Sequence, residues 1–402
     1  MADPTAAGPR LTPRGLMALA VALVLVALNL RTTVASLPPL LAAVREDIPL
    51  TGAVAGLLTA TPVLCMAWLA PPAVRIARRW GAPVATLAAV VLISVGNGLR
   101  GLSGSSAALL LATLVAGAGV ATAGVVVPAV VKDAFPGRAG AATGGYAVAM
   151  MLGAATSATF SAPLANALGS WRGGLSIWAL PAAAAAVLWA VVARRLSRGA
   201  TGPRERPPHV ALPWRSRPAW LLVAFMSAQS ALAYAYLGWL APAYVERGWS
   251  GFAAGALVGV NNLAQLGAAL VLPALADRIA GFRRLVVGAV SLTVVGTAWF
   301  WLLPDAAPWL ASVVLGAGLG AGFALGLTRI VHYAADAQAS SRLTALVFLV
   351  SYTVAAAAPV AVGVLHDTSG GFALPFGLLV LLSLTQWTVA GRLGPDHIGT
   401  VR

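Results

Sequence analysis

The sequence predicts an all-α membrane protein whose twelve transmembrane helices form two pseudo-symmetric six-helix bundles. Three observations support this fold class. The 402 residues are 59% hydrophobic and only 9% charged, whereas soluble domains carry about 25% charged residues. The chain divides at its charges into twelve apolar stretches, each able to cross a bilayer as a helix of about 20 residues. The two halves also resemble each other at an offset of about 200 residues, the sign of an internal repeat.

The first apolar stretch runs from Gly15 to Val44 and holds Arg31, which we expect to be the only charge deep in any span. A cation at that depth costs roughly 2.5–3.5 kcal/mol on insertion scales, so it usually faces a bundle interior or a water-filled cavity. Asn29 and Thr33 lie four residues apart and share one face of the same helix. We therefore predict that Arg31, Asn29 and Thr33 bind a solute.

The other eleven stretches lack charge, except for Arg329 at the end of the tenth. They lie approximately at 50–74, 82–99, 106–131, 140–167, 173–193, 218–244, 251–275, 285–303, 308–330, 343–365 and 372–391. Ala, Leu, Val and Gly dominate them, which favours helices over barrel strands. Basic residues such as Arg75, Arg78 and Arg79 fall in the predicted connecting loops.

The loop charges predict the orientation in the membrane. With a cytoplasmic N-terminus, only four of the 26 Lys and Arg residues, namely Arg45, Arg100, Arg172 and Arg247, fall on the outer side. All others except Arg31 are then cytoplasmic, as the positive-inside rule requires. We expect a multi-pass protein of the cell membrane with both termini in the cytoplasm. The net charge of +15 thus reflects orientation, and no nucleic-acid partner is expected.

The longest hydrophilic segment divides the spans six and six. It covers 194–217, is rich in Pro and Arg, and is predicted to be a cytoplasmic linker. We expect an N-terminal bundle at 1–193, a C-terminal bundle at 218–393 and a cytoplasmic tail at 394–402. In the repeat, Gly117 aligns with Gly318 and Gly119 with Gly320. Such small residues let helices approach closely.

The acidic residues are informative by their positions. All eleven Asp and Glu residues fall in a loop, in a tail or at a span end. The predicted spans thus offer no central carboxylate for a proton relay or for a cationic solute. The positive Arg31 instead favours an anionic or strongly dipolar solute. No metal, cofactor or catalytic residue is expected, and the one cysteine, Cys65, is expected to serve packing.

Polar and aromatic residues on other spans could complete the site. The further candidates for solute binding are Tyr146, Gln229, Tyr234, Trp239, Asn262 and Tyr352. Each could instead only hydrogen-bond a neighbouring helix, which is worth about 0.6 kcal/mol on average. Asp277 and Arg278, between the eighth and ninth stretches, are candidates for a conformational latch that pairs charges between helices, or for simple orientation by positive charge.

These segments resemble the major facilitator superfamily. LPALADR at 272–278 is similar to the superfamily's loop motif between the second and third helices, in its second-half copy. The first-half copy, PPAVRIARRWG at 71–81, keeps the basic cluster but lacks the aspartate. NLRTTVASLPPLL at 29–41, the run at 125–155 and QSALAYAYLGWLAP at 229–242 resemble the cyanate and 2-nitroimidazole porter branch.

The resemblance covers nearly the whole chain and implies two bundles with alternating access to a central site. By position it marks Asn29 and Arg31, and also Tyr146 and Trp239, as cavity residues. We expect a secondary-active or facilitative transporter of a small polar or anionic organic solute, cyanate-like or nitroimidazole-like. Drug or antibiotic efflux by the same superfamily is the alternative. The expected partners are the lipid bilayer, the solute and, if transport is coupled, an ion; we expect a monomer.

Two other classes of protein fit the sequence poorly. A membrane-embedded enzyme such as a lipid-linked transferase would need acidic or histidine clusters, commonly in a sizeable outer loop. The predicted outer loops are short, and only Glu46 and Asp47 pair two carboxylates there. A membrane sensor would need an added soluble domain to relay a signal. We therefore expect neither an enzyme nor a sensor.

Overall fold

The computed structural model describes residues 13–135, 139–197, 212–276, 281–394 and 398–401. Within these ranges the chain is almost entirely helical, and the one extended pairing is an isolated bridge between Ala334 and Val401. Eleven segments of the described chain are long and apolar enough to cross a membrane. A bent pair of helices makes twelve if it is counted as one span. The all-helical membrane fold predicted from sequence is therefore confirmed.

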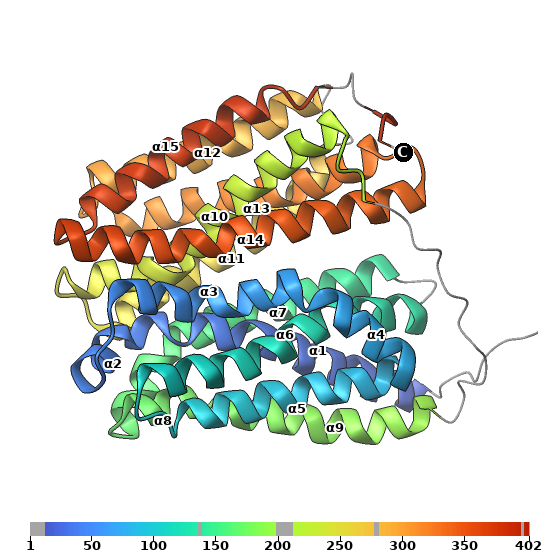
Figure 1. The fold of residues 1–402 in the computed structure, drawn as a ribbon, viewed down its shortest axis with the longest axis horizontal. Helices are drawn as coiled ribbons and strands as arrows, with labels where there is room; N and C mark the ends of the chain where they lie inside the picture. Colours follow the sequence, from blue (N-terminus) through green and yellow to red (C-terminus); the bar gives the residue numbers. More distant parts are fainter. Residues whose placement is uncertain (1–12, 136–138, 198–211, 277–280, 395–397, 402) are drawn as a thin grey trace, which may run out of the picture.

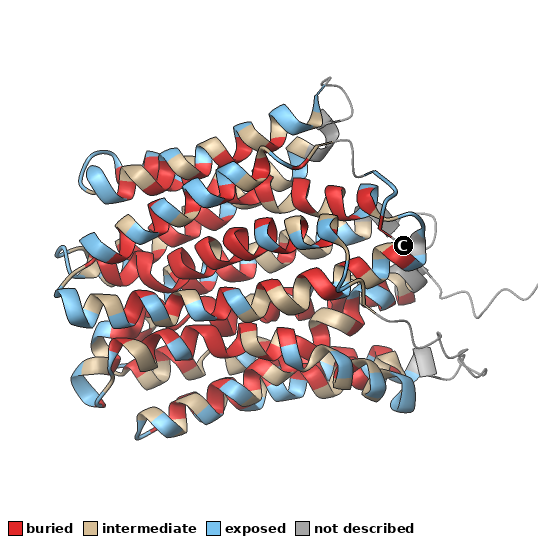
Figure 2. Ribbon diagram, turned by 45° about the horizontal axis from the view of Figure 1, so that its top comes forward, coloured by how far each residue is buried: buried red, intermediate tan, exposed pale blue. Residues whose placement is uncertain are grey.

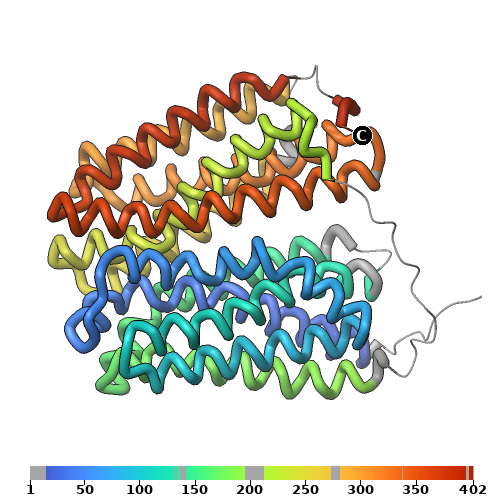
Figure 3. Tube along the Cα trace, in the orientation of Figure 1, coloured from blue at the N-terminus to red at the C-terminus, as the bar shows by residue number. Residues whose placement is uncertain are grey.

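Figures 1 and 3 show the helices as two groups, one coloured from blue to green and the other from yellow-green to red. The first half contains α1 (Pro13–Ala35), the 3-10 turn η1 (Pro38–Leu40), α2 (Leu41–Asp47), α3 (Gly52–Trp68), α4 (Ala70–Trp80), α5 (Ala82–Arg100), α6 (Ser106–Ala134), α7 (Ala139–Ala167), α8 (Trp171–Ser176) and α9 (Ala179–Ser197). The second half contains α10 (Arg217–Val245), α11 (Gly251–Ala276), α12 (Phe282–Leu302), α13 (Pro308–Tyr333), α14 (Ala337–Ser369) and α15 (Ala373–Ala390).

We call the end of the molecule where α9 finishes and α10 begins the linker end, and the opposite end the far end. The predicted linker starts too early, because α9 continues through Arg194 to Ser197. The predicted latch residues, Asp277 and Arg278, lie outside the described residues.

One predicted element gains detail and another is corrected. The first apolar stretch forms one candidate span, Gly15–Asp47, but its helix is interrupted, because α1 ends at Ala35 and the chain bends before η1. Pro38 and Pro39 begin η1, and a proline has no backbone N–H with which to continue the hydrogen bonds of α1. The basic cluster predicted to be a loop is helical, forming α4, which is bent by 56° from α3. Pro71 lies in its first turn, where the missing N–H does no harm.

The glycine repeat is real, but its register differs from the predicted one. Gly119 of α6 packs against α5, and Gly318 of α13 packs against α12, the matching helix of the second half. Gly117 packs against α3, and Gly316 packs against α11 in the same way. Gly320 instead meets the backbone of α11. The equivalents of Gly117 and Gly119 are therefore Gly316 and Gly318, because each pair packs against corresponding helices of the two halves, whereas the alignment of the sequence had matched glycines by type alone.

The hydrophobic core is shared at the far end and divided at the linker end. One cluster combines buried residues of both halves, such as Val34 and Ala158 with Leu240 and Ala356. Two further clusters, nearer the linker end, each draw on a single half. Figure 2 shows buried residues along the inner helices and exposed residues at the helix ends and on the outer helices. The halves thus pack together at the far end.

Candidate functional site

A cavity of about 150 Å³ lies between the two halves. The first half contributes one α1 residue and two α7 residues to its wall, and α10, α11, α13 and α14 contribute the rest. The lining residues are Arg31, Ala147, Met151, Gln229, Ser230, Ala233, Tyr234, Gln265, Leu266, Ala269, Leu319, Gly320, Phe323 and Tyr352. Four of the predicted site residues, Arg31, Gln229, Tyr234 and Tyr352, meet here. A site between halves is where secondary transporters bind their solutes.

Arg31 lines the cavity from α1 and faces the second half. Its Cζ atom lies 5.8 Å from the centre of the Tyr234 ring, a cation–π distance. Among the described residues no carboxylate forms an ion pair with Arg31. Tyr146 lies close enough to interact electrostatically with Arg31 and Tyr352. The Arg31 guanidinium therefore keeps hydrogen-bonding capacity that the described protein does not use for an acidic partner.

The Gln229 amide is oriented by a chain of hydrogen bonds from behind the cavity wall. Its Nε2 donates to the Leu319 carbonyl oxygen at 2.6 Å. Because a carbonyl oxygen only accepts, the Gln229 Oε1 must face the other way. There it accepts from Nε2 of Gln386, a buried residue of α15, at 2.5 Å. One Gln229 N–H remains, and Gln229 adds a hydrogen-bond donor to a cavity that already holds Arg31.

Aromatic rings form part of the cavity wall on the second half. Tyr234 and Tyr352 meet edge to face with ring centres 6.2 Å apart. Phe348 stands behind Tyr352 at 5.1 Å and behind Phe323 at 6.4 Å. This arrangement holds the ring faces in place and offers apolar surface beside the cation. The cavity can therefore hold a small solute that has both a π face and hydrogen-bond acceptors.

Four predicted site residues lie away from this cavity. Asn29 is buried and donates to the Leu25 carbonyl of its own helix at 2.8 Å. Asn262 likewise donates to Val258 at 2.9 Å. The Trp239 indole N–H reaches the Pro359 carbonyl at 2.8 Å, nearer the far end.

The fourth residue, Thr33, belongs to a buried network with Arg100. The Thr33 hydroxyl donates to Asn97 at 3.3 Å. Arg100 is fully buried, and its Nη1 donates to the Thr33 carbonyl at 3.0 Å, Ser36 at 3.2 Å and Asn97 at 3.4 Å. Arg100 is thus a second buried cation, but it lies at the end of its span and not deep within it. Arg100 binds the C-terminal turn of α1, where the helix dipole favours a cation.

Gln265, a further polar residue of the eighth span, also lines the cavity. Two residues were missed because hydropathy does not show which way a residue faces: Phe323 lines the cavity, and Gln386 supports Gln229 from an apolar peripheral helix. For Gln386 a signal did exist, since an amide in an otherwise apolar span must find a partner within the protein.

The seam between the halves is closed at the far end and separated at the linker end. Gly56 of α3 lies against Pro359 of α14, and Gly255 of α11 lies against Ala158 of α7, with no room for a Cβ atom. Toward the linker end, Figure 1 shows the helices of the two halves farther apart than at the far end. The halves therefore diverge from the cavity toward the linker end.

Known proteins resemble this chain over nearly its whole length. The 2-nitroimidazole transporter of Escherichia coli (strain K12) is 32% identical over 364 residues, which cover 90% of this chain and 91% of the relative. The cyanate transport protein CynX of the same organism is 30% identical over 373 residues, covering 93% and 96%. The uncharacterized transporter YycB of Bacillus subtilis (strain 168) is 27% identical, covering 93% of each chain.

Solved structures agree on the fold. The nucleoside transporter NupG has a TM-score of 0.74 at 11% identity, covering 93% of this chain and 98% of that one. A bacterial homolog of the human lysosomal transporter Spinster, captured inward-facing and occupied, has a TM-score of 0.73 at 16% identity, covering 96% and 98%. At such low identity these likenesses show the fold alone. The family model of the Major Facilitator Superfamily matches residues 19–359, and this chain belongs to that superfamily of membrane transporters.

Proposed function

We propose that this transporter carries a small polar or anionic organic solute, cyanate-like or nitroimidazole-like, by alternating access to the central cavity. The observation that supports this most is Arg31, a cation that lines the cavity and has no carboxylate partner among the described residues. Gln229 supplies a donor beside it, and Tyr234 and Tyr352 supply ring surface. An acceptor-rich planar solute satisfies all three groups. The 2-nitroimidazole named for one relative fits this description, and the cyanate named for another is a small linear anion that Arg31 can pair with.

Flux into proteoliposomes tests the proposal. We expect uptake of cyanate or of 2-nitroimidazole by the native protein and its loss in Arg31→Ala, because the solute loses its cationic partner. Arg283→Ala is the matched control, since Arg283 is an exposed arginine at the start of α12. Equal flux in native protein and Arg31→Ala would reduce Arg31 to a packing residue.

Drug efflux is the second candidate, and the apolar side of the cavity favours it. Part of the cavity wall is apolar and offers no hydrogen-bonding group; it is formed by Met151, Leu266 and Phe323. A panel of lipophilic drugs in the same liposomes separates the candidates. Drug flux that persists in Arg31→Ala would support efflux, whereas flux of small anions that depends on Arg31 would support our first proposal.

We propose that the protein is a monomer in the cell membrane. We further propose that its linker end lies in the cytoplasm, because the basic residues concentrate at that end. Trp214→Cys places a thiol at an exposed position of the linker end, and Ala306→Cys places one at the far end. An impermeant maleimide should label the second in intact cells and the first only in inverted vesicles. The native Cys65 is buried, so it gives little background.

A further inference from the structure

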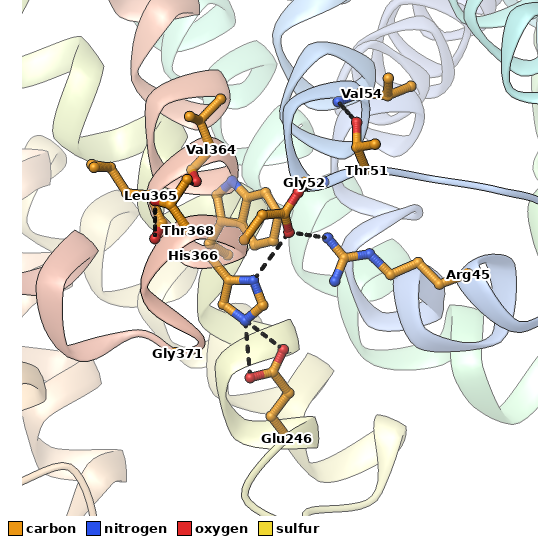
Figure 4. Close-up of polar contacts among 12 residues, drawn as sticks. Arg45, Thr51, Gly52, Val54, Glu246, Val364, Leu365, His366, Thr368 and Gly371 are labelled. Atoms are coloured by element: carbon orange, nitrogen blue, oxygen red, sulfur yellow. Dashed lines mark hydrogen bonds and ion pairs between the residues drawn. The ribbon is translucent and has the colours of Figure 1, made fainter.

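The far end of the seam is joined by a carboxylate that crosses between the halves. Asp367, in the last turn of α14, accepts a hydrogen bond from the backbone N–H of Gly52 at 2.5 Å. Figure 4 shows the surroundings of this contact, with Arg45 and Gly52 of the first half near His366 and Glu246 of the second. Gly52 is the first residue of α3, and the first N–H groups of a helix have no partner within it. A carboxylate there also interacts favourably with the helix dipole. The second half therefore completes the start of a helix in the first half.

The first half also supplies a cation to the same carboxylate. Arg45 of α2 places Nη2 at 3.8 Å from Asp367 Oδ1, and its Cζ lies 5.8 Å from the Trp239 ring centre. Side-chain exposure is 26% for Arg45 and 38% for Asp367. A cavity of about 220 Å³ lined by Arg45 and Glu246 lies beside them. Water, and protons with it, can therefore reach the contact.

Within the second half, His366 stands between two carboxylates. Its Nε2 lies 2.9 Å from Glu246 Oε1, and its Nδ1 lies 3.5 Å from Asp367 Oδ1. The imidazole is stacked on Trp239, with 24° between the rings. A neutral imidazole has one N–H, whereas both ring nitrogens here face carboxylate oxygens. One added proton would satisfy both contacts.

The charges that face one another are thus Arg45 from α2, Glu246 after α10, and His366 and Asp367 from α14; we call these four residues the far-end cluster. We propose that the far-end cluster is a proton-binding site that links acidity to opening of the far end. Glu246, His366 and Asp367 move with the second half, while Arg45 and Gly52 move with the first. Separating the halves removes the cation and the N–H donor but leaves two carboxylates together.

The sign of the effect follows from this division. When the seam opens, the two carboxylates and the imidazole lose the positive charge of Arg45, so they bind a proton more tightly than when the seam is closed. By reciprocity, a proton must favour the open seam by the same factor. Acid therefore opens the far end, and deprotonation closes it, because Asp367 must be ionised to hold both Arg45 and the start of α3. This extends the proposed function but depends on neither the solute nor the orientation.

Distance measurements between spin labels on purified full-length protein test this directly. Ala107→Cys and Ala306→Cys place one label at the start of α6 and one before α13, both exposed at the far end. Cys65→Ala removes the native thiol. The pH is varied between about 4.5 and 8, across the ordinary carboxyl and imidazole range. We expect the short distance at high pH and a growing long-distance population in acid.

Asp367→Asn keeps the shape of the carboxylate but removes its charge, so we expect the long distance at every pH. The closed-to-open ratio should fall about tenfold or more, since a hydrogen bond to a charged group is lost. Arg45→Gln removes the cation from the other half and should open the seam in the same way.

Asp47→Asn is the matched control. Asp47 is also a far-end carboxylate, but its partners Trp171 and Arg172 belong to its own half. It should behave as the native protein does. A closed, pH-responsive distance in Asp367→Asn would overturn the proposal. A native distance that ignores pH would overturn it too, whether or not Asp367→Asn opens the seam. Loss of solute flux alone would bear on the transport proposal and not on this one.

Discussion

Arg31 and Arg100 are two arginines in the same half of the molecule, and the protein treats them in opposite ways. Arg100 is fully buried, and three acceptors lie within hydrogen-bond reach, one on α1, one directly after α1 and one on α5. Arg31 faces a cavity between the halves, with a tyrosine ring as its described partner across the seam. Neither has a carboxylate partner among the described residues.

The difference shows how to separate a structural cation from a functional one. Arg100 donates to the Thr33 carbonyl group in the last turn of α1 and to the side chains of Ser36 and Asn97, so acceptors of its own half hold it at a fixed position. The Arg31 charge lies where the wall of the protein is incomplete, so compensation can come from a solute. Burial alone would have ranked Arg100 first; the presence of fixed acceptors is what assigns it to structure.

The largest expected effects, on stability for Arg100 and on solute flux for Arg31, come from replacing each of these arginines with Met. We expect Arg100→Met to lower the free energy of unfolding by about 2 kcal/mol or more, because hydrogen bonds of a charged group are lost. Arg31→Met should keep the native stability and lose solute flux. Thermal unfolding in detergent and flux in liposomes measure the two effects. Similar stability losses in both variants would erase the distinction.

A middle-sized effect is expected from Gln386→Leu, which removes the donor that orients Gln229. The Gln229 amide then loses its fixed direction, and we expect a KM for transport raised about tenfold, the effect of one hydrogen bond of roughly 1.4 kcal/mol, with kcat little changed. Thr385→Val is the control, since the exposed Thr385 hydroxyl bonds only to its own helix. An unchanged KM in Gln386→Leu would show that Gln229 is held by Leu319 alone.

The smallest effect is expected from Thr33→Val, which sharpens the boundary between the two arginine environments. Its hydroxyl donates to Asn97 in the Arg100 network. Losing one such bond between helices costs about 0.6 kcal/mol, with solute flux unchanged. A small drop in the unfolding temperature with native flux assigns Thr33 to the structural network. A native unfolding temperature with altered flux would move it to the transport site.

The fold was predictable because a bilayer constrains composition and span length strongly. The cavity position of Arg31 was predictable for the same reason, since a lone charge in an apolar span needs a special environment. The cavity is also lined by Gln229, Tyr234 and Tyr352. Their spans contain other polar residues that the sequence presents as equally good candidates for the site. Sequence could not rank those residues, because the direction of a side chain depends on how the helices are rotated about their axes.

Other features depended on contacts between distant segments. Arg100 is the last residue of its helix, so the sequence predicts an exposed charge in a loop. In the structure α1 ends beside Arg100, and the Thr33 carbonyl group accepts a hydrogen bond from it. Trp239 reads as a cavity residue, but its indole finds a carbonyl on α14 instead. The Gly119 repeat was shifted because a glycine-rich helix matches itself in several registers. In each case the environment of the residue depends on a helix that is distant in the sequence, and local sequence does not identify that helix.

The glycines of the far-end seam have a consequence for how easily the seam can separate. Gly52 meets Gly363 and Gly255 meets Ala158 through backbone atoms. Ordering a long side chain costs up to about 2 kcal/mol of rotamer entropy, whereas glycine and alanine have almost none to lose. When glycine and alanine surfaces come into contact, few side-chain rotamers are lost, and few are regained when the contact breaks. The closed and separated arrangements can therefore lie close in free energy, so a single charge or a single small solute has enough influence to choose between them.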